Sequence, residues 1–123
     1  MFIVYCVLAV LYSAMLIFSG ITKLQLHPEA VRIMHDVIGV PLAFFPVLAA
    51  LEFAAAAGLL AGMRWARLGA AAATGAILYF IGAIVSHLRV DDLAGIGGAA
   101  FMLTMAVVLL AIKVKTLRGV PVR

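Results

Sequence analysis

The sequence predicts an all-α integral membrane protein, a bundle of four transmembrane helices with one short interfacial helix between spans one and two. Hydrophobic residues make up 67% of the 123 positions and charged residues only 11%, whereas soluble domains average roughly half apolar and a quarter charged. Four apolar runs of about 20 residues, the length that crosses a bilayer, nearly exhaust the chain. We therefore expect a single transmembrane domain over residues 1–123.

The first span and the linker after it have different patterns. Residues 2–21 carry no charged side chain and are long enough to cross the hydrocarbon core. In the linker, Pro28 suits a first helical position, Glu29 suits a first turn, and Gly39 ends the helix. Apolar and charged residues of the segment 28–38 fall on opposite sides with a 3.6-residue period, which is typical of a helix lying in the membrane interface.

The remaining elements are three further spans and a tail. The second span is expected at residues 41–62, with Pro46 as an alternative start of its regular helix. The third and fourth are expected at 68–87 and 93–112, before a basic tail at 113–123. Alanine and glycine are abundant in these spans, and such small residues allow close helix packing.

The distribution of charge predicts the orientation. An even number of spans puts both termini on one face, with six Lys or Arg there against three on the other face, and the positive-inside rule then places both termini in the cytoplasm. The cationic residues of the terminal face are Arg64, Arg67, Lys113, Lys115, Arg118 and Arg123. The opposite face holds Lys23, Arg32 and Arg89 with the acidic residues Glu29, Asp36, Asp91 and Asp92.

Glu52 is the leading candidate for a functional residue. It is the only carboxylate well inside a predicted span, where an ionised group is costly without a partner. Lys23 lies at the outer end of the first span, so an ion pair between the two would offset the burial of both. A purely structural alternative stays open, in which Glu52 clamps the second span to the first and Lys23 reaches the interface.

Further polar residues are expected beside this pair, in an outward-facing pocket. His87 and Arg89 end the third span at the outer face, and Asp91 or Asp92 could hold either of them in place. A histidine there could exchange protons near neutral pH. Hydroxyl groups that could hydrogen-bond between helices form a secondary set, for which packing roles are more common than ligand roles: Ser19, Thr22, Tyr79, Ser86 and Thr104.

Several other chemistries are not supported by the sequence. Cys6 is the only cysteine, which excludes an intrachain disulfide and a CxxC redox pair. The three histidines lack the spacing of a helical ligand pair, so no metal site is expected, and no cofactor is evident. The basic residues form no stripe, so nucleic acid is not expected as a partner. Without a thiol pair, metal set or nucleotide motif, the sequence leans against an enzyme.

Three motifs resemble the DoxX-like family of small four-helix bacterial membrane proteins. They are SGITKL at residues 19–24, LEFAAAAGLLAG at 51–62 with its single Glu, and HLRVDD at 87–92 before a Gly-rich fourth span. The similarity covers most of the chain and includes the amphipathic linker. It implies a four-helix bundle in the cytoplasmic, or inner, membrane of a bacterium, and it maps the family's polar positions onto Lys23, Glu52 and His87.

The resemblance and the charge cluster lead to two main functional hypotheses. The first is an accessory or scaffolding subunit of a membrane complex linked to redox chemistry or oxidative stress. Its partners would be the lipid bilayer and other membrane proteins or a second copy, and its outward pocket could bind a quinone or a lipid. The alternative is a small proton-coupled dimeric transporter that uses Glu52 as its switch. A third possibility is an enzyme with quinone as redox partner, which needs a bound cofactor because no side-chain set here can carry two electrons.

Overall fold

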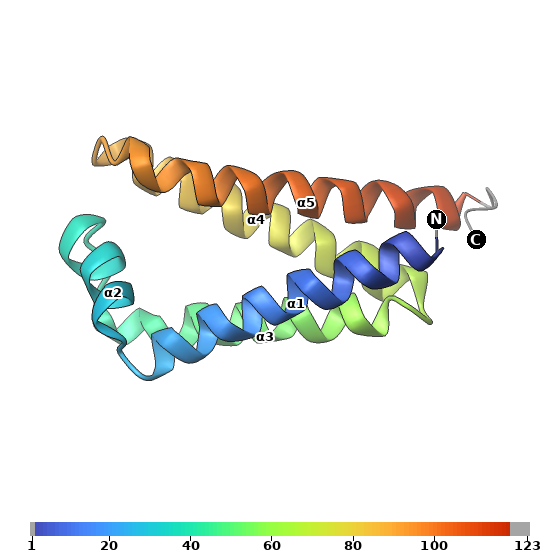
Figure 1. Cartoon of the computed structure of the whole chain (residues 1–123), viewed down its shortest axis with the longest axis horizontal. Coiled ribbons are helices and arrows are strands. Elements are labelled where there is room, and N and C mark those ends of the chain that lie inside the picture. The colour runs from blue at the N-terminus through green and yellow to red at the C-terminus, as the bar shows by residue number, and fades with distance from the viewer. Residues whose placement is uncertain (1, 119–123) are drawn as a thin grey trace.

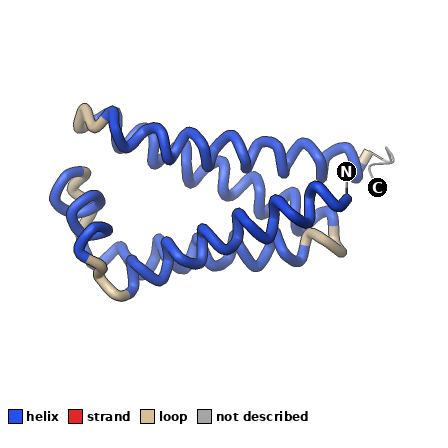
Figure 2. Tube along the Cα trace, in the orientation of Figure 1, coloured by secondary structure: helices blue, strands red, loops and turns tan. Residues whose placement is uncertain are grey.

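The chain is built from helices joined by short loops. The computed structural model describes residues 2–118, and within them no strand occurs (Figure 2). The expected all-α class is confirmed, with four long apolar helices and a short helix between the first and second spans. The elements are α1 (Phe2–Leu24), α2 (Pro28–Val31), a turn of π-helix η1 (Arg32–Val37), a 3₁₀ turn η2 (Leu42–Phe44), α3 (Phe45–Ala61), α4 (Ala66–Arg89) and α5 (Leu93–Leu117).

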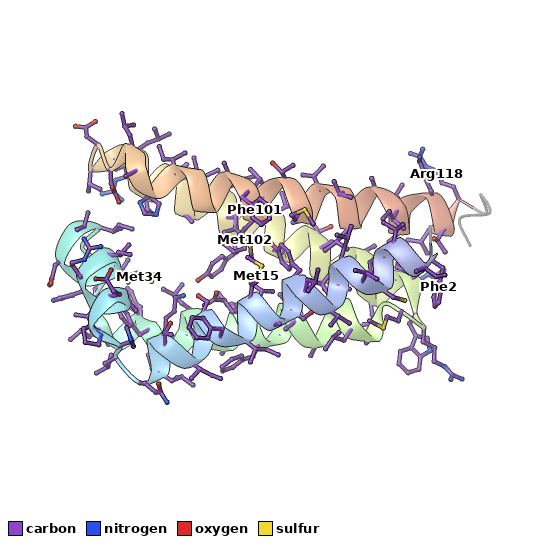
Figure 3. All side chains as sticks on the ribbon, in the orientation of Figure 1. Phe2, Met15, Met34, Phe101, Met102 and Arg118 are labelled. Carbon is purple, nitrogen blue, oxygen red and sulfur yellow. The ribbon has the colours of Figure 1, made fainter. Side chains whose placement is uncertain are left out.

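The four long helices form two packed pairs. Helix α1 lies along α3, and α4 lies along α5, while the two pairs contact each other mainly through α3 and α4 (Figure 1). The pairs diverge toward the end of the bundle where α2 lies (Figure 1), and Phe2 and Arg118, the first and last described residues, lie at the opposite end (Figure 3). At the diverging end, α1, α2, η1, α3, α4 and α5 all contribute side chains to one pocket.

The interior of the bundle combines small residues with a few aromatic side chains. Tyr5 donates a hydrogen bond to the Leu59 carbonyl oxygen at 2.7 Å, and Tyr12 donates to the Met102 carbonyl oxygen at 3.0 Å. Each bond satisfies a buried hydroxyl and ties α1 to another helix. The core residues are Tyr5, Ala9, Tyr12, Leu16, Ala56, Leu59, Ala73, Ala76, Phe80, Ala99, Ala106, Leu109 and Ile112.

The outer surface of the long helices is apolar. Only 22–28% of each candidate span is buried within the bundle. Large side chains such as Ile3, Phe18 and Leu93 are exposed by 74%, 71% and 70%. Exposure of continuous apolar faces of this size to water is unfavourable, whereas the hydrocarbon core of a bilayer solvates them. The chain is therefore a multi-pass membrane protein with four candidate spans.

The helix bounds extend the expected spans. Helix α5 continues to Leu117, beyond 112, because residues 113–117 contain no glycine or proline, so Lys113 and Lys115 are helical rather than part of a tail. The remainder of that tail, 119–123, lies outside the described residues. Helix α3 begins at Phe45, and Pro46 occupies its first turn, where a missing N–H costs nothing.

Two glycines bring α3 and α4 into contact at the end that carries the chain termini. A Cβ atom at Gly62 would lie 2.5 Å from the Gly69 Cα, and it would also meet the Tyr5 hydroxyl. Lys113 is buried beside them, with its Nζ 3.9 Å from the centroid of the Tyr5 ring. The cation lies over the aromatic face, which is an attractive arrangement. This end of the bundle, which we call the closed end, is thus tightly packed, in contrast to the end where α2 lies.

Candidate functional site

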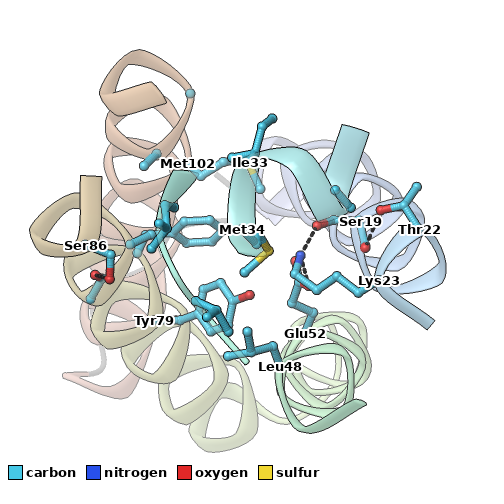
Figure 4. A pocket seen from close by; sticks show the side chains of 18 of the residues that line it. Ser19, Thr22, Lys23, Ile33, Met34, Leu48, Glu52, Tyr79, Ser86 and Met102 are labelled. Atoms are coloured by element: carbon cyan, nitrogen blue, oxygen red, sulfur yellow. Dashed lines mark hydrogen bonds and ion pairs between the residues drawn. The ribbon is translucent and has the colours of Figure 1, made fainter. Parts of the chain in front are cut away.

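A buried ion pair joins α1 to α3 at the open end of the bundle. The Nζ atom of Lys23 lies 2.7 Å from Oε1 of Glu52, and it donates a hydrogen bond to the Ser19 Oγ at 2.7 Å (Figure 4). Lys23 and Glu52 are exposed by only 6% and 3%. The predicted pair is therefore present in the structure, with Ser19 as a third member placed one helical turn before Lys23.

Close packing of the two helices places this pair. A Cβ atom at Gly20 would lie 2.6 Å from the Phe53 ring, so the absence of a side chain at Gly20 leaves space for this ring between α1 and α3. Ser13 strengthens the same contact with a hydrogen bond of 3.3 Å to the Ala56 carbonyl oxygen. The register set by these contacts brings Lys23 opposite Glu52.

The pair is held chiefly by its charges. Although Oε1 of Glu52 lies 2.7 Å from Nζ, it accepts no hydrogen bond of good geometry within the described residues. An ion pair in a low-dielectric interior needs additional hydrogen bonds to offset the loss of water. Ser19 supplies one bond to the ammonium, but Oε1 has capacity for an incoming hydrogen-bond donor.

Tyr79 faces this pair from α4. Its hydroxyl points toward the Glu52 carboxylate, with which it interacts (Figure 4). The Tyr79 ring packs edge-on against Phe80 at a centroid distance of 5.0 Å, and Phe80 packs against Tyr12 at 6.4 Å. This aromatic contact fixes the hydroxyl between the two helix pairs. The sequence placed Tyr79 only among the secondary candidates, and the structure places its hydroxyl beside the Glu52 carboxylate.

These groups line one large pocket, which we call the polar pocket. Its volume is about 860 Å³, in the range of small-molecule sites, and its surface is mostly apolar. Met15 from α1 and Met102 from α5 face each other across it (Figure 3). The polar side chains in its lining are Ser19, Thr22, Lys23, His27, Glu29, Glu52, Tyr79, Ser86 and His87.

His87 lies in the pocket wall near the end of α4 and has a carboxylate partner. Its Nδ1 lies 2.9 Å from Oδ2 of Asp92, in the turn before α5. Gly95 makes room for the imidazole, because a Cβ atom there would collide with the ring. The carboxylate orients the imidazole and favours a proton on Nδ1. His87 is therefore a fixed polar group about 8% exposed.

Arg89 and Asp91 do not join this site. Both are exposed, neither lines the polar pocket, and neither makes an ion pair within the part of the chain that the structure describes. Asp91 has a φ of +55° in the tight turn between α4 and α5, which directs the chain so that Asp92, not Asp91, reaches His87. Of the two aspartates expected as the partner, Asp92 is the one in place.

The secondary hydroxyl residues have mixed placements. Ser19 and Ser86 line the polar pocket, although Ser86 donates its proton to the Gly82 carbonyl oxygen of its own helix at 2.8 Å. Thr22 donates to the Ser19 carbonyl oxygen at 2.7 Å. Thr104 is exposed on α5 and donates to its own helix. Of these hydroxyl residues, Ser19 contacts the Lys23 side of the ion pair and Tyr79 the Glu52 side.

The segment α2–η1 covers the open end of the pocket. Ala30, Ile33 and Met34 line the polar pocket, while the charged side chains of Glu29 and Arg32 pair at 2.9 Å on the outside. The hydrogen bond from Arg32 lowers the pKa of Glu29, and the same bond raises the pKa of Arg32. This amphipathic division agrees with the expected interfacial helix, although its second half is π-helical.

Within residues 2–118, no group of three or more His, Cys, Asp or Glu side chains is placed to hold a metal ion. The side chains around the polar pocket that can donate hydrogen bonds include an ammonium, a phenol, hydroxyl groups and two imidazoles. Such donors suit a ligand that presents carbonyl or hydroxyl oxygens.

These features define a class of protein: a four-span membrane bundle with a charged pair buried beside an intramembrane pocket. Comparison with protein families identifies the relationship, since the model of the DoxX-like family matches residues 7–113. The chain belongs to the DoxX-like family. No curated protein and no solved structure matches it.

Proposed function

We propose that this protein binds a lipid-soluble ligand, such as a quinone or a lipid, in the polar pocket. The observation that carries the proposal is the buried Lys23–Glu52 pair, with Tyr79 beside it, on the wall of an otherwise apolar pocket. A carbonyl or hydroxyl oxygen of the ligand would accept a hydrogen bond from the Lys23 ammonium or the Tyr79 hydroxyl. A ligand hydroxyl would also donate to Oε1 of Glu52.

Ligand binding requires that the buried ion pair keep hydrogen-bonding capacity that no protein group uses. Lys23 has three N–H donors, of which one goes to Ser19 and one faces Glu52. The third is available to a ligand. A salt bridge that only clamped two helices would not need a pocket of 860 Å³ on its surface. The size and the polar wall together favour binding.

Extraction of bound small molecules tests this function. The protein would be purified in mild detergent beside Tyr79→Phe and Glu52→Gln variants, and the organic extracts compared by mass spectrometry. We expect the wild type to retain a quinone or lipid in near-stoichiometric amount and both variants to lose most of it. Thr104→Val, which removes an exposed hydroxyl on α5, serves as the matched control. Equal retention by all four proteins would contradict the proposal.

We further propose that the protein acts as an accessory or scaffolding subunit of a redox-linked or oxidative-stress-linked complex in a bacterial inner membrane. Support comes from its membership of the DoxX-like family and from the apolar outer faces of its helices, which a membrane partner could cover. Crosslinking in intact membranes followed by purification tests this role. A specific partner is expected. A solitary chain, and unchanged survival of oxidative stress on deletion, would count against it.

One observation favours proton-coupled transport as a second candidate. Glu52 lines both the polar pocket and a second, smaller pocket, so a proton on its carboxylate could be exchanged from either. Liposomes carrying an imposed pH gradient and an internal pH-sensitive dye test this candidate. Faster decay of the gradient with wild type than with Glu52→Gln would support transport. Equal rates with empty liposomes, wild type and variant would reject it.

A further inference from the structure

A groove between α3 and α4 continues from the polar pocket toward the end of the bundle where the loop between α3 and α4 lies. This α3–α4 groove has a volume of about 540 Å³ and is lined mainly by alanine, glycine and leucine side chains. Gly58 and Ala72 form its floor, because a Cβ atom at Gly58 would lie 2.6 Å from the Cβ of Ala72. Leu68 and Leu78, exposed by 49% and 65%, stand at its rims and face the lipid.

The groove and the polar pocket share one polar wall. Glu52, Leu78, Tyr79 and Phe80 line both, so the two spaces meet beside the carboxylate. Glu52 is 3% exposed and its Oε1 accepts no hydrogen bond within the described residues. Oε1 of Glu52 therefore lies where the apolar groove joins the polar pocket. This carboxylate oxygen distinguishes the groove from a helix contact that is made by small residues alone.

We propose that the α3–α4 groove holds the apolar chain of the ligand whose polar head lies beside Glu52 and Tyr79. This inference rests on the proposed binding function and adds the ligand class: an amphiphile with an oxygen-bearing head and one long apolar chain. The groove extends along α4 from Leu68 to Phe80, or about 18 Å at 1.5 Å per residue. A long hydrocarbon chain fills such a channel, whereas a compact molecule leaves it empty.

The groove would select the ligand by shape. Lipid chains are as apolar as alanine and leucine, so transfer of a chain from the bilayer into the groove gains no hydrophobic free energy. The favourable free energy of binding comes from van der Waals packing of the chain against Gly58 and Ala72 and from placing the polar head next to Glu52. Access from the bilayer through the exposed rims removes any need for the chain to cross water.

Photolabelling in nanodiscs tests the proposal with two probes, a short-chain and a long-chain methyl ketone, each with a diazirine at the end of the chain. We expect the long-chain probe to label α3 and α4 peptides that contain the groove, and the short-chain probe to label residues of the polar pocket. Gly75→Leu should reduce groove labelling by the long-chain probe several-fold and leave short-chain labelling unchanged. Gly75 lies in the groove lining and its Cβ position is open, so leucine can fill the groove without a clash at Cβ.

Gly97→Leu is the matched control, because Gly97 has an equally open Cβ position on α5 and lines neither space. Two results would overturn the groove assignment alone, provided that the short-chain probe still labels the pocket saturably. The first is long-chain labelling between α1 and α5, and the second is groove labelling that Gly75→Leu leaves unchanged. No saturable labelling by either probe would overturn the proposed binding function together with it.

Discussion

Lys23 and Glu52 each depend on the other for their burial in the bundle. The two side chains come from different helices and meet at 2.7 Å, with exposures of 6% and 3%. Removing one partner leaves a charge without its counter-ion in a low-dielectric site, whereas removing both partners leaves no buried charge. The difference in stability between the single and the double variant therefore measures the interaction between the two charges.

We expect Lys23→Met to destabilise the bundle by about 3–5 kcal/mol, the usual cost of breaking a buried pair. The double variant Lys23→Met/Glu52→Gln should recover most of that loss. Thermal unfolding in one detergent, followed by circular dichroism, gives the comparison. A single variant as stable as the wild type would show that the two charges are not coupled.

Gly95 offers a second residue-scale prediction. Gly95→Ala should lower the melting temperature and weaken the contact between His87 and Asp92, because the added methyl group would occupy the space of the imidazole ring. The NMR chemical shifts of the His87 imidazole at a fixed pH report the contact. Gly97→Ala, at an open position on the same helix, should leave both readouts unchanged.

At the scale of elements, the contacts between helices differ from one end of the bundle to the other. Helices α3 and α4 meet through Gly62 and Gly69 near the chain termini, while the opposite end is open and covered by α2–η1. The covering segment forms no core of its own and includes no buried residue. Its position depends on apolar contacts with the pocket rim and on the exposed Glu29–Arg32 pair.

Substitution at the glycine contact should have a large effect. Gly62→Ala is expected to separate α3 from α4, because its Cβ would overlap the Gly69 backbone and the Tyr5 hydroxyl. The melting temperature should fall by several degrees, consistent with the cost of overpacking a tight site. Gly75→Ala, on α4 with an open Cβ position, is the matched control and should leave the melting temperature unchanged.

The covering segment should respond to acid. The pKa of Glu29 in the folded protein is lowered by Arg32, so the pair contributes at neutral pH and its contribution is lost as the pH falls through that lowered value. Hydrogen exchange in residues 28–37, corrected for intrinsic rates, should therefore increase only in strongly acidic buffer. Glu29→Gln should show the faster exchange already at neutral pH. Identical exchange in both proteins would contradict a role for the pair, whose exposure to solvent makes it weak.

At the scale of the whole molecule, the sequence predicts the fold better than the site. Apolar runs of membrane length suffice to define four spans, and the polarity of residues 28–38 suffices to predict the interfacial helix. The meeting of Lys23 with Glu52 also follows from their depths in adjacent spans. The selection of Asp92 over Asp91 depends on a left-handed turn that no periodicity specifies. The position of Tyr79 depends on the rotation of α4, which many alternative small-residue contacts would permit.

The orientation of the bundle is a whole-molecule prediction. We expect both termini in the cytoplasm, because six Lys or Arg residues lie on the terminal face against three on the other. A C-terminal green fluorescent protein fusion should fluoresce, and a C-terminal alkaline phosphatase fusion should be inactive. The opposite pair of results would place the polar pocket on the cytoplasmic side.

A high-resolution density map of the wild-type protein in nanodiscs of native lipid tests the central claim most directly. We expect density for a bound molecule in the polar pocket, with an oxygen within hydrogen-bond distance of Tyr79 or Lys23 and a chain running along α3 and α4. The corresponding map of Tyr79→Phe/Glu52→Gln should lack it. A wild-type map in which side chains or disordered lipid alone fill the space beside an intact Lys23–Glu52 pair would contradict ligand binding and leave the pair as a structural clamp.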